Sequence, residues 1–363
     1  MHALVTGGGG FLGRYIVEGL LARGDRVRSY GRGAYPELEA AGVEVIRGDL
    51  RDAAALAAAC EGIECVFHAA AIPGISLNRD AYESVNRTGT EQLLSAAWRS
   101  GVARFVYTSS PSVVFSGHDQ CGVDESAPYD FGWMEANRAY YSHTKAAAEQ
   151  VVLAANCDEF RTCALRPHLI WGPRDTHLIP RLLARARSGR LRRIGPGTNL
   201  VDMTYIENAA AAHLQAADAL AARDSALSER AESCSATEAT ASSGTFDRAG
   251  SSPTPAGKAY FLSQGEPVNC WQWINEILAL VNLPPVQKWV SARAAERIGA
   301  ACESAYRVLR LSGEPPMTRF LATQLSTSHW FDISAARRDF GYYPRISTAE
   351  GMQRLATWLR DSN

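Results

Sequence analysis

Ala3-Leu4-Val5-Thr6-Gly7-Gly8-Gly9-Gly10-Phe11-Leu12-Gly13 is the stretch that decides the fold of this chain. Its three apolar residues suit a buried parallel strand, and its glycines allow a sharp turn whose backbone N–H groups face a pyrophosphate at the start of a helix. A helical pattern follows at 14–21, and a second strand is expected at 26–30, at the spacing of a βαβ unit. This order predicts a dinucleotide-binding turn formed by Gly7, Gly10, Phe11, Leu12 and Gly13.

The rest of the pattern extends this unit into an α/β fold, a Rossmann-type doubly wound parallel sheet with a smaller, mainly helical C-terminal substrate domain. The 363 residues suffice for a large α/β domain with such a companion. Strands are expected at 43–47, 65–68, 104–107, 161–167 and 258–263, and helices at 53–60, 82–101, 179–189 and 270–281, with one more that starts at 140.

The sequence divides into three regions. Residues 1–180 are expected to form the dinucleotide-binding domain, to which 200–220 and 258–264 return. Residues 181–363 are expected to bind substrate and to cover it. Within them, 222–257 are rich in Ser, Ala, Thr and Gly and show no apolar period, which predicts a disordered low-complexity insertion.

A helix is expected at 291–311, and its apolar face has several explanations. Ile298, Ala301, Tyr306 and Leu309 recur at helical spacing. They suit a core-facing stripe, a substrate tunnel or a membrane-facing surface. The core interpretation is the one we take as the prediction.

Composition excludes several classes of partner and location. A net charge of -1 argues against nucleic acid as a partner. The first strand begins at the N-terminus without a basic and apolar leader, and no apolar stretch is long enough to span a membrane. The eight cysteines are scattered and form no CxxC pair, which favours free thiols in a reducing, cytoplasmic location and predicts no metal site.

The end of the second strand bears on the choice of cofactor. An NAD-preferring enzyme usually places an acidic residue there, on the ribose 2′-hydroxyl, but this chain has Gly31-Arg32. The planar guanidinium of Arg32 suits a 2′-phosphate, which favours NADP(H), with NAD(H) as the alternative. An ordinary exposed loop charge is the competing interpretation of Arg32.

Other cofactor contacts are expected where further strands end. The third strand leads into Asp49 and Leu50, which places Asp49 near the adenine edge. The fourth strand runs into Ala69, a small residue that lets a cofactor approach closely. Pro167 ends the strand at 161–167 and completes this set.

The strand at 104–107 leads into Thr108, Ser109 and Ser110 at the carboxyl edge of the sheet, where ligands bind in open α/β folds. A helix then begins with Tyr140 and Tyr141. Only Tyr141 has a lysine, Lys145, four residues later, so these two side chains share a helix face.

This tyrosine and lysine pair has a chemical meaning. A nearby ammonium favours the phenolate and brings the pKa of a tyrosine closer to neutral pH, which suits Tyr141 for proton transfer. A hydroxyl from Ser110 would then hold a substrate oxygen in the same place.

Together these residues resemble the extended short-chain dehydrogenase/reductases, and within them the 3β-hydroxysteroid dehydrogenase branch. The resemblance spans nearly the whole chain and rests on Thr6-Gly7-x-x-Gly10-x-x-Gly13, Tyr107-Thr108-Ser109-Ser110, Tyr141-x-x-x-Lys145, Leu165-Arg166-Pro167 and Thr204-Tyr205-Ile206-x-Asn208. Stretches such as Leu169-Ile170-Trp171-Gly172-Pro173 and residues 310–321 are similar to those of bacterial reductases of long-chain olefin biosynthesis.

The resemblance implies NADPH-dependent reduction of a 2-alkyl-3-oxoalkanoate to the 2-alkyl-3-hydroxyalkanoate. It implies that Tyr141 is the acid, that Lys145 binds the nicotinamide ribose and tunes Tyr141, and that Ser110, or Ser109 in its place, holds the ketone oxygen. The implied partners are a lipid-like small-molecule substrate, other enzymes of olefin synthesis and, by analogy with the wider family, a second copy in a homodimer.

Three other functions share parts of this pattern. An NAD-dependent 3β-hydroxysteroid or sterol dehydrogenase has the same catalytic residues, although Gly31-Arg32 weighs against it. Nucleotide-sugar epimerases and dehydratases usually carry an Arg-Asp pair before the strand at 204–205, where this chain has Leu200-Val201-Asp202-Met203. A non-catalytic NADP sensor typically loses the Tyr or the Lys that this chain keeps.

Overall fold

The computed structural model describes residues 1–235, 254–311 and 313–361. Its centre is a seven-stranded sheet in the order β12-β7-β5-β4-β1-β2-β3, in which every pair of neighbours is parallel. The chain returns to this sheet late, because β12 is an edge strand beside β7. The strands are β1 (His2–Thr6), β2 (Arg26–Gly31), β3 (Glu44–Arg47), β4 (Cys65–His68), β5 (Arg104–Thr108), β7 (Arg161–Pro167) and β12 (Ala259–Leu262).

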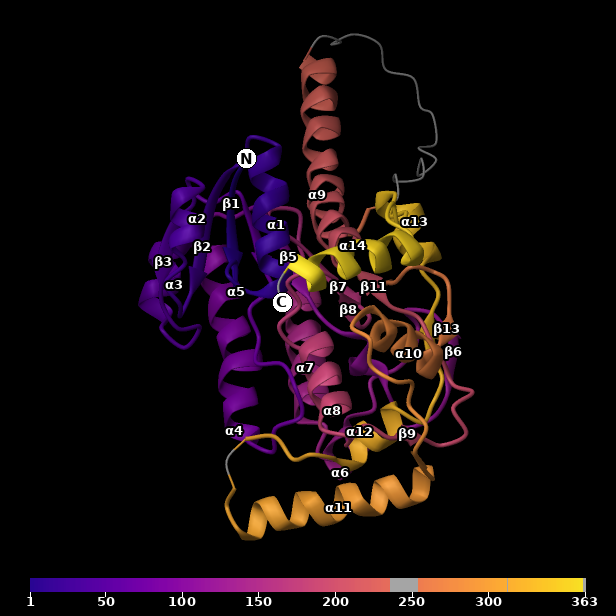
Figure 1. The fold of residues 1–363 in the computed structure, drawn as a ribbon. Helices are drawn as coiled ribbons and strands as arrows, with labels where there is room; N and C mark the ends of the chain where they lie inside the picture. The colour runs from indigo at the N-terminus through magenta and orange to yellow at the C-terminus, as the bar shows by residue number, and fades with distance from the viewer. Residues whose placement is uncertain (236–253, 312, 362–363) are drawn as a thin grey trace, which may run out of the picture.

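Helices cover both faces of this sheet (Figure 1). Because side chains alternate along a strand, Ala3 and Val5 of β1 pack in the core beneath α1 and α9, whereas Leu4 packs in the core beneath α3, α5 and α7. The helices are α1 (Phe11–Ala22), α2 (Pro36–Ala40), α3 (Ala53–Cys60), α4 (Arg79–Tyr82), α5 (Gly89–Arg99), α7 (Tyr140–Ala154) and α9 (Ile206–Ser235). A π-helical turn at Glu83–Thr88 joins α4 to α5.

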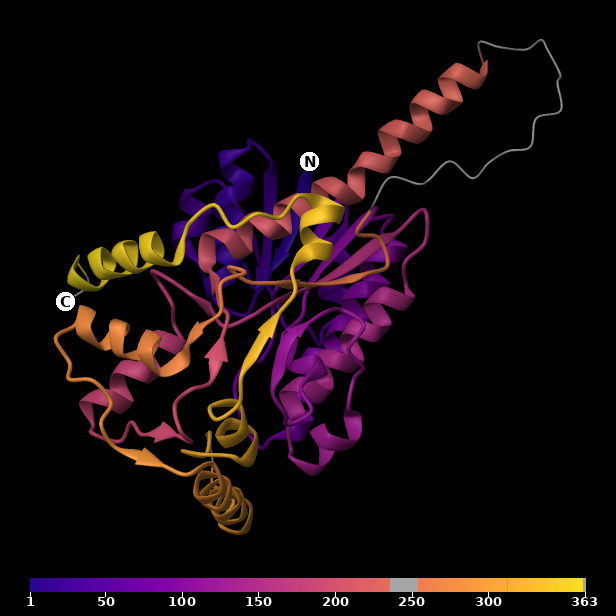
Figure 2. The same ribbon diagram turned by 90° about the vertical axis from the view of Figure 1, so that its right-hand side faces the viewer.

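A second body lies at the carboxyl edge of the sheet (Figure 2). It contains a mixed four-stranded sheet, β13-β10-β15-β6, and two parallel pairs, β11 with β8 and β14 with β9. Its strands are β6 (Gln120–Val123), β8 (Ile170–Trp171), β9 (Arg193–Ile194), β10 (Leu200–Val201), β11 (Thr204–Tyr205), β13 (Val268–Asn269), β14 (Trp289–Val290) and β15 (His329–Phe331). Its helices are α6 (Phe131–Ala136), α8 (Leu178–Arg187), α10 (Cys270–Leu280), α11 (Ala292–Val308), α12 (Arg319–Gln324), α13 (Ser334–Phe340) and α14 (Thr348–Asp361), with a 3₁₀ turn at Pro111–Val114.

The structure differs from the expected insertion at 222–257 in its first part. Helix α9 continues to Ser235. Alanine, leucine, arginine and glutamate are strong helix formers, so helix propensity continues past the point where the apolar period ends. Residues 236–253 lie outside the described residues, so the prediction of disorder is not tested there.

The core interpretation of the 291–311 helix is wrong. In α11, Ile298 is 50% exposed, and Leu309, which follows the helix, is 65% exposed. The face that packs against the protein carries Ala295, Gly299 and Glu303 instead. Figure 1 shows α11 at the bottom of the molecule, with one side toward α12 and the other free. In the described part of the chain, no helix is both long and apolar enough to cross a membrane.

Candidate active site

The glycine turn between β1 and α1 is closed by its own backbone. Gly7 has φ 71° and donates its N–H to Tyr30, and the N–H of Gly10 donates to the carbonyl of Gly7 at 2.8 Å. A Cβ at Gly13 would lie 2.1 Å from the same carbonyl oxygen, so only glycine lets α1 begin this close to β1. Gly10 is the N-cap of α1 and supplies no side-chain cap, which leaves the start of the helix open to an anion.

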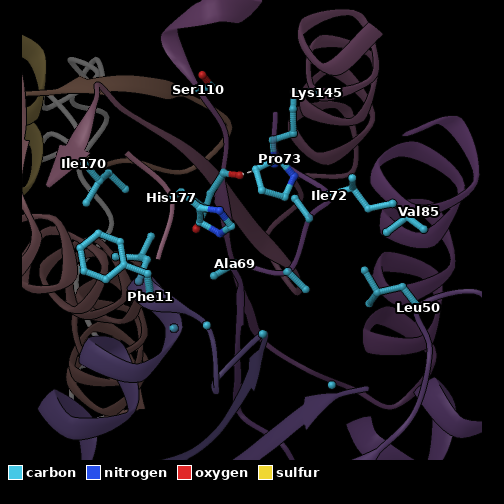
Figure 3. Close-up of a pocket in the computed structure, with 18 of the residues that line it drawn as sticks. Phe11, Leu50, Ala69, Ile72, Pro73, Val85, Ser110, Lys145, Ile170 and His177 are labelled. Atoms are coloured by element: carbon cyan, nitrogen blue, oxygen red, sulfur yellow. Dashed lines mark hydrogen bonds between the residues drawn. The ribbon is translucent and has the colours of Figure 1, made fainter. Parts of the chain in front are cut away.

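A cavity of about 810 Å³ runs from this turn to the carboxyl ends of β5 and β7. It brings together every residue that the sequence predicted for catalysis or cofactor binding. These are Gly7, Gly10, Phe11, Leu12, Gly13, Arg32, Asp49, Leu50, Ala69, Ser110, Tyr141, Lys145 and Pro167. Figure 3 shows Ser110 and Lys145 at the upper side of this cavity and Phe11 and Ala69 below them. Its volume and the open helix start fit a dinucleotide.

The end of β2 carries no carboxylate. Gly31, Arg32 and Gly33 line the cavity, and the Arg32 side chain is exposed. Asp49, at the end of β3, is held by Arg51 at 2.7 Å. This guanidinium, more than the weaker charge of Arg32, lowers the pKa of Asp49 to about 2. This end of the cavity therefore has one carboxylate, Asp49, and one arginine, Arg32, on its wall, while Arg51 pairs with that carboxylate from outside the lining.

The predicted acid, Tyr141, lies in the first turn of α7. The edge of the Tyr82 ring approaches the Tyr141 ring, with 6.3 Å between the centroids. Burial raises the pKa of Tyr141, and a hydrogen bond with Ser110 acts in the opposite direction. The expected lowering of this pKa by Lys145 is not found, because burial dominates and the ammonium is bound elsewhere.

Lys145 is buried and has two partners on β5. Its Nζ donates to the backbone carbonyl of Thr108 at 2.5 Å and lies 4.0 Å from the centre of the Tyr107 ring. Burial lowers the pKa of Lys145 to about 7, against the weaker influence of Glu149. These contacts place the amine at the carboxyl edge of the sheet, one helical turn from Tyr141.

The two serines after β5 have different surroundings. Ser110 accepts the N–H of Ser112 and lies 3.0 Å from its hydroxyl, so it caps the 3₁₀ turn that follows. Ser109 is buried, and its hydroxyl has no hydrogen-bond partner among the described residues. Both line the cavity, so each is placed to meet a ligand oxygen.

An ion pair behind α7 fixes the catalytic helix to the sheet. Glu149, one turn after Lys145, is paired at 2.5 Å with Arg166 of β7, and both side chains are buried. Tyr129 donates to the same carboxylate at 2.6 Å. The orientation of α7, and so of Tyr141, depends on this pair.

Several residues at the site were not predicted from the sequence to contact Lys145 or to line the cavity. The carbonyl of Thr108 and the ring of Tyr107 hold Lys145, and Ile72, Pro73 and His177 line the cavity (Figure 3). Backbone carbonyls and apolar walls carry no residue-type signature. A signal existed for Tyr107 and Thr108, which belong to the same motif as Ser109 and Ser110.

Comparison with known proteins identifies the family to which the chain belongs. The sequence profile of the 3-beta hydroxysteroid dehydrogenase/isomerase family matches residues 4–290. The chain belongs to this family. It is an NAD(P)-dependent oxidoreductase that acts on a hydroxyl or keto group, as its relatives do.

Individual relatives differ in their activity. The chain is 46% identical to a 2-alkyl-3-oxoalkanoate reductase of Stenotrophomonas maltophilia, over 98% of each chain. It is 32% identical to the human sterol-4-alpha-carboxylate 3-dehydrogenase, decarboxylating, over 98% of this chain and 87% of that one. Among solved structures, MoeE5 in complex with UDP-glucose and NAD matches over 100% of this chain and 99% of its own, with a TM-score of 0.69 at 24% identity, which shows the shared fold.

Proposed function

We propose that this family member reduces a 2-alkyl-3-oxoalkanoate to the 2-alkyl-3-hydroxyalkanoate. The observation that carries the proposal is the full-length similarity to a reductase of that name, combined with a cavity that holds Ser110, Tyr141 and Lys145 together. The human sterol relative is more distant, which favours the keto acid over a sterol.

Tyr141 and a serine have separate roles in the proposed reduction. A reduced nicotinamide held in the cavity would supply the hydride to the carbonyl carbon. The phenol of Tyr141 donates its proton to the carbonyl oxygen, so that the C=O double bond becomes CH–OH, and solvent restores the tyrosine proton. Ser110 or Ser109 donates a hydrogen bond to the same oxygen and stabilises the developing negative charge.

Lys145 supports both cofactor and acid. Its amine lies beside the cavity and would bind the ribose hydroxyls of the nicotinamide end. Because the pKa of Lys145 is about 7 before any ligand arrives, hydroxyl ligands and the negative charge of a tyrosinate would both favour its ammonium form.

NADP(H) is the proposed cofactor. Arg32 lies where β2 ends, and Gly31 and Gly33 beside it supply no carboxylate to repel a 2′-phosphate. The proposed substrate is a lipid-like small molecule. A homodimer and association with other olefin-pathway enzymes are proposals that the sequence resemblance supports. A cytoplasmic location is a proposal that the scattered cysteines support.

The test is oxidation of a long-chain 2-alkyl-3-hydroxy acid, followed by absorbance of the reduced nicotinamide. This direction is chosen because 3-keto acids decarboxylate on standing. The hydroxy acid and a 3β-hydroxysterol are each assayed with NADP and with NAD. Turnover of the hydroxy acid with NADP is expected. Turnover of the sterol alone, with NAD, would overturn both the substrate and the cofactor.

Tyr141→Phe is expected to lower kcat by about 100-fold or more, because it removes the proton donor. Tyr140→Phe is the matched control, since the neighbouring ring faces Arg79 rather than the cavity. Equal losses in the two variants would remove Tyr141 from the proposed mechanism.

A further inference from the structure

Three buried polar side chains meet where β7, β11 and β15 come together, outside the set that performs the reaction. Nδ1 of His168 lies 2.6 Å from a carboxylate oxygen of Asp202. Nε2 of His168 lies 3.1 Å from Nδ1 of His329. The segments are distant in sequence: His168 follows β7, Asp202 lies between β10 and β11, and His329 begins β15.

The ends of this chain of contacts are occupied by groups of known polarity. Nε2 of His329 lies 2.9 Å from the backbone carbonyl of Gln324, which can only accept a hydrogen bond. The second carboxylate oxygen of Asp202 accepts the backbone N–H of Phe331 at 3.0 Å. Every polar atom of the cluster therefore has a partner.

The number of hydrogens that these hydrogen bonds require determines the charge of the cluster. The Gln324 carbonyl requires a hydrogen on Nε2 of His329, and the contact between the rings requires one more. The third contact, between His168 and Asp202, requires a hydrogen as well. Two neutral imidazoles carry only two hydrogens, so the cluster holds one proton more than two neutral histidines and a carboxylate would.

The surroundings decide which ring holds the extra proton. Burial, and next the proximity of His168, lower the pKa of His329 to about 4. The Asp202 carboxylate contacts the His168 ring directly, and His329 lies on the far side of that ring, so the hydrogen count places the extra proton on His168. The other titratable group beside Asp202 is Tyr342, whose pKa burial and that carboxylate raise, so it stays neutral. The rings of Phe115 and Phe331 contact His329 and His168, respectively, at nearly right angles.

His168 is fixed within the wall of the active-site cavity. Its neighbours in sequence, Pro167 and Leu169, both line that cavity. Leu169 has φ 42°, in the left-handed region that a non-glycine residue adopts only when its surroundings hold it there. The Thr204 hydroxyl also bonds the His168 backbone, so main chain and ring are both anchored.

We propose that His168 is a positioning residue whose imidazolium, held between Asp202 and His329, keeps Pro167 and Leu169 in the shape that accepts the cofactor. The inference concerns the cofactor cavity and does not depend on which keto or hydroxy compound is the substrate. Loss of the proton leaves one of the hydrogen bonds of the cluster without a hydrogen. Pro167 and Leu169 are then no longer held in place.

Two variants separate the charge from the contacts. In Asp202→Asn, the amide can donate to a neutral His168 and its oxygen can accept from Phe331, so every contact is kept without the extra proton. In His329→Gln, the amide can accept from His168 and donate to Gln324, so the proton stays. The first variant removes the imidazolium and the second keeps it.

The direct measurement is ¹⁵N NMR of the histidine rings in the cofactor-free protein at neutral pH. We expect His168 to show two protonated ring nitrogens in wild type and in His329→Gln, and one in Asp202→Asn. His68 and His213 are internal references, because burial lowers their pKa values to about 3 and about 4 and keeps them neutral. A neutral His168 in wild type overturns the proposal, and this result does not require any variant to fold.

The second measurement is NADPH binding, followed by nicotinamide fluorescence, as the pH is raised. Wild type and His329→Gln should lose about tenfold in affinity when the proton leaves, because a small displacement of the wall misplaces the cofactor. Asp202→Asn, in which every contact keeps its hydrogen without the extra proton, should bind NADPH as wild type does at neutral pH and keep that affinity as the pH is raised. Parallel pH profiles for wild type and Asp202→Asn would show a merely structural role. If the keto-acid assignment fails while these results hold, only the proposed function is lost.

Discussion

Lys145 shows how a single buried residue links stability to function. Its amine has left water for the carbonyl of Thr108 and the face of Tyr107, and burial disfavours its charged form. This desolvation of the amine occurs at the position where a bound dinucleotide would bring polar hydroxyl groups. The free protein is thus less stable than its fold alone would allow, and the loss is concentrated at one side chain.

This cost predicts a dependence of stability on pH. The pKa of Lys145 is lowered to about 7 in the folded state and is about 10.4 when unfolded. Between these values the unfolded state binds the proton and the folded state does not, so the free energy of unfolding rises with pH, by up to about 1.4 kcal/mol per pH unit. Below about pH 7 the full cost is present and the dependence ends.

Lys145→Met removes the group, so urea unfolding of wild type and variant without cofactor should converge as the pH is raised from about 7 to about 10. In the difference between the two free energies of unfolding, the contributions of the other titrating groups cancel. If the two curves stay parallel, the amine is not desolvated as the structure indicates.

The sequence could predict residue types at the site but not their local partners. Tyr141 and Lys145 were found because a spacing of four on a helix is a local property. The Thr108 carbonyl that captures the lysine has no side-chain signature, so the expected effect of Lys145 on the pKa of Tyr141 was wrong. The contact of His168 with His329 joins residues far apart in sequence, and nothing short of the fold shows it.

At the scale of elements, the turn between β1 and α1 is where the fold most strictly requires particular residues, namely glycines. Its backbone hydrogen bonds bring the Gly7 carbonyl against the first turn of α1, so the separation of strand and helix is set there. Any cofactor phosphate bound at this helix start depends on that separation.

Gly13→Ala is therefore expected to abolish measurable NADPH binding and to cost about 1–3 kcal/mol of stability, since its Cβ would lie 2.1 Å from a backbone oxygen. Gly132→Ala in α6 is the control. There the new Cβ would meet nothing nearer than a side-chain oxygen of Asp130 at 3.5 Å, and alanine favours the helix by up to about 1 kcal/mol. Calorimetry and fluorescence titration compare the two, and normal binding by Gly13→Ala would contradict the close approach.

Element boundaries were most predictable where local signals are strong. The helix at 53–60 and the strands at 65–68 and 161–167 have the expected bounds, because Asp52 caps the helix and buried strands are continuous apolar runs. The helix expected at 82–101 begins earlier, at Arg79, and contains a π-helical turn that periodicity does not reveal.

Across the whole molecule, the second body is attached to the site through its helices as well as its strands. Glu303 of α11 is buried, and its carboxylate bonds both the backbone and the guanidinium of Arg319 in α12. Just before and within α12, Thr318 and Phe320 share a crevice with Tyr140 and Tyr141 of the catalytic helix. The position of α11 therefore bears on the reacting residues although its outer face is in solvent.

Which face of α11 is buried could not be read from its sequence, because the packed face carries an alanine, a glycine and a glutamate while the free face carries Ile298. Hydrophobic periodicity assigned the two faces in reverse. The correct assignment requires the partner helix, and the glycine that permits its close approach is informative only once that helix is known.

Two neighbouring residues of α11 test this arrangement. Gly299→Ala would place its Cβ 2.5 Å from the backbone carbon of Thr318, so α11 and α12 must separate, at a cost of about 1–3 kcal/mol. Because Thr318 and Tyr141 line the same crevice, kcat/KM should fall as well. Ile298→Ala changes a half-exposed side chain and should alter stability by no more than about 0.5 kcal/mol, whereas the same change in a core costs about 2–5 kcal/mol. Chemical denaturation and steady-state kinetics of both variants decide the orientation of the helix, and a larger loss for Ile298→Ala than for Gly299→Ala would restore the core interpretation that the structure rejects.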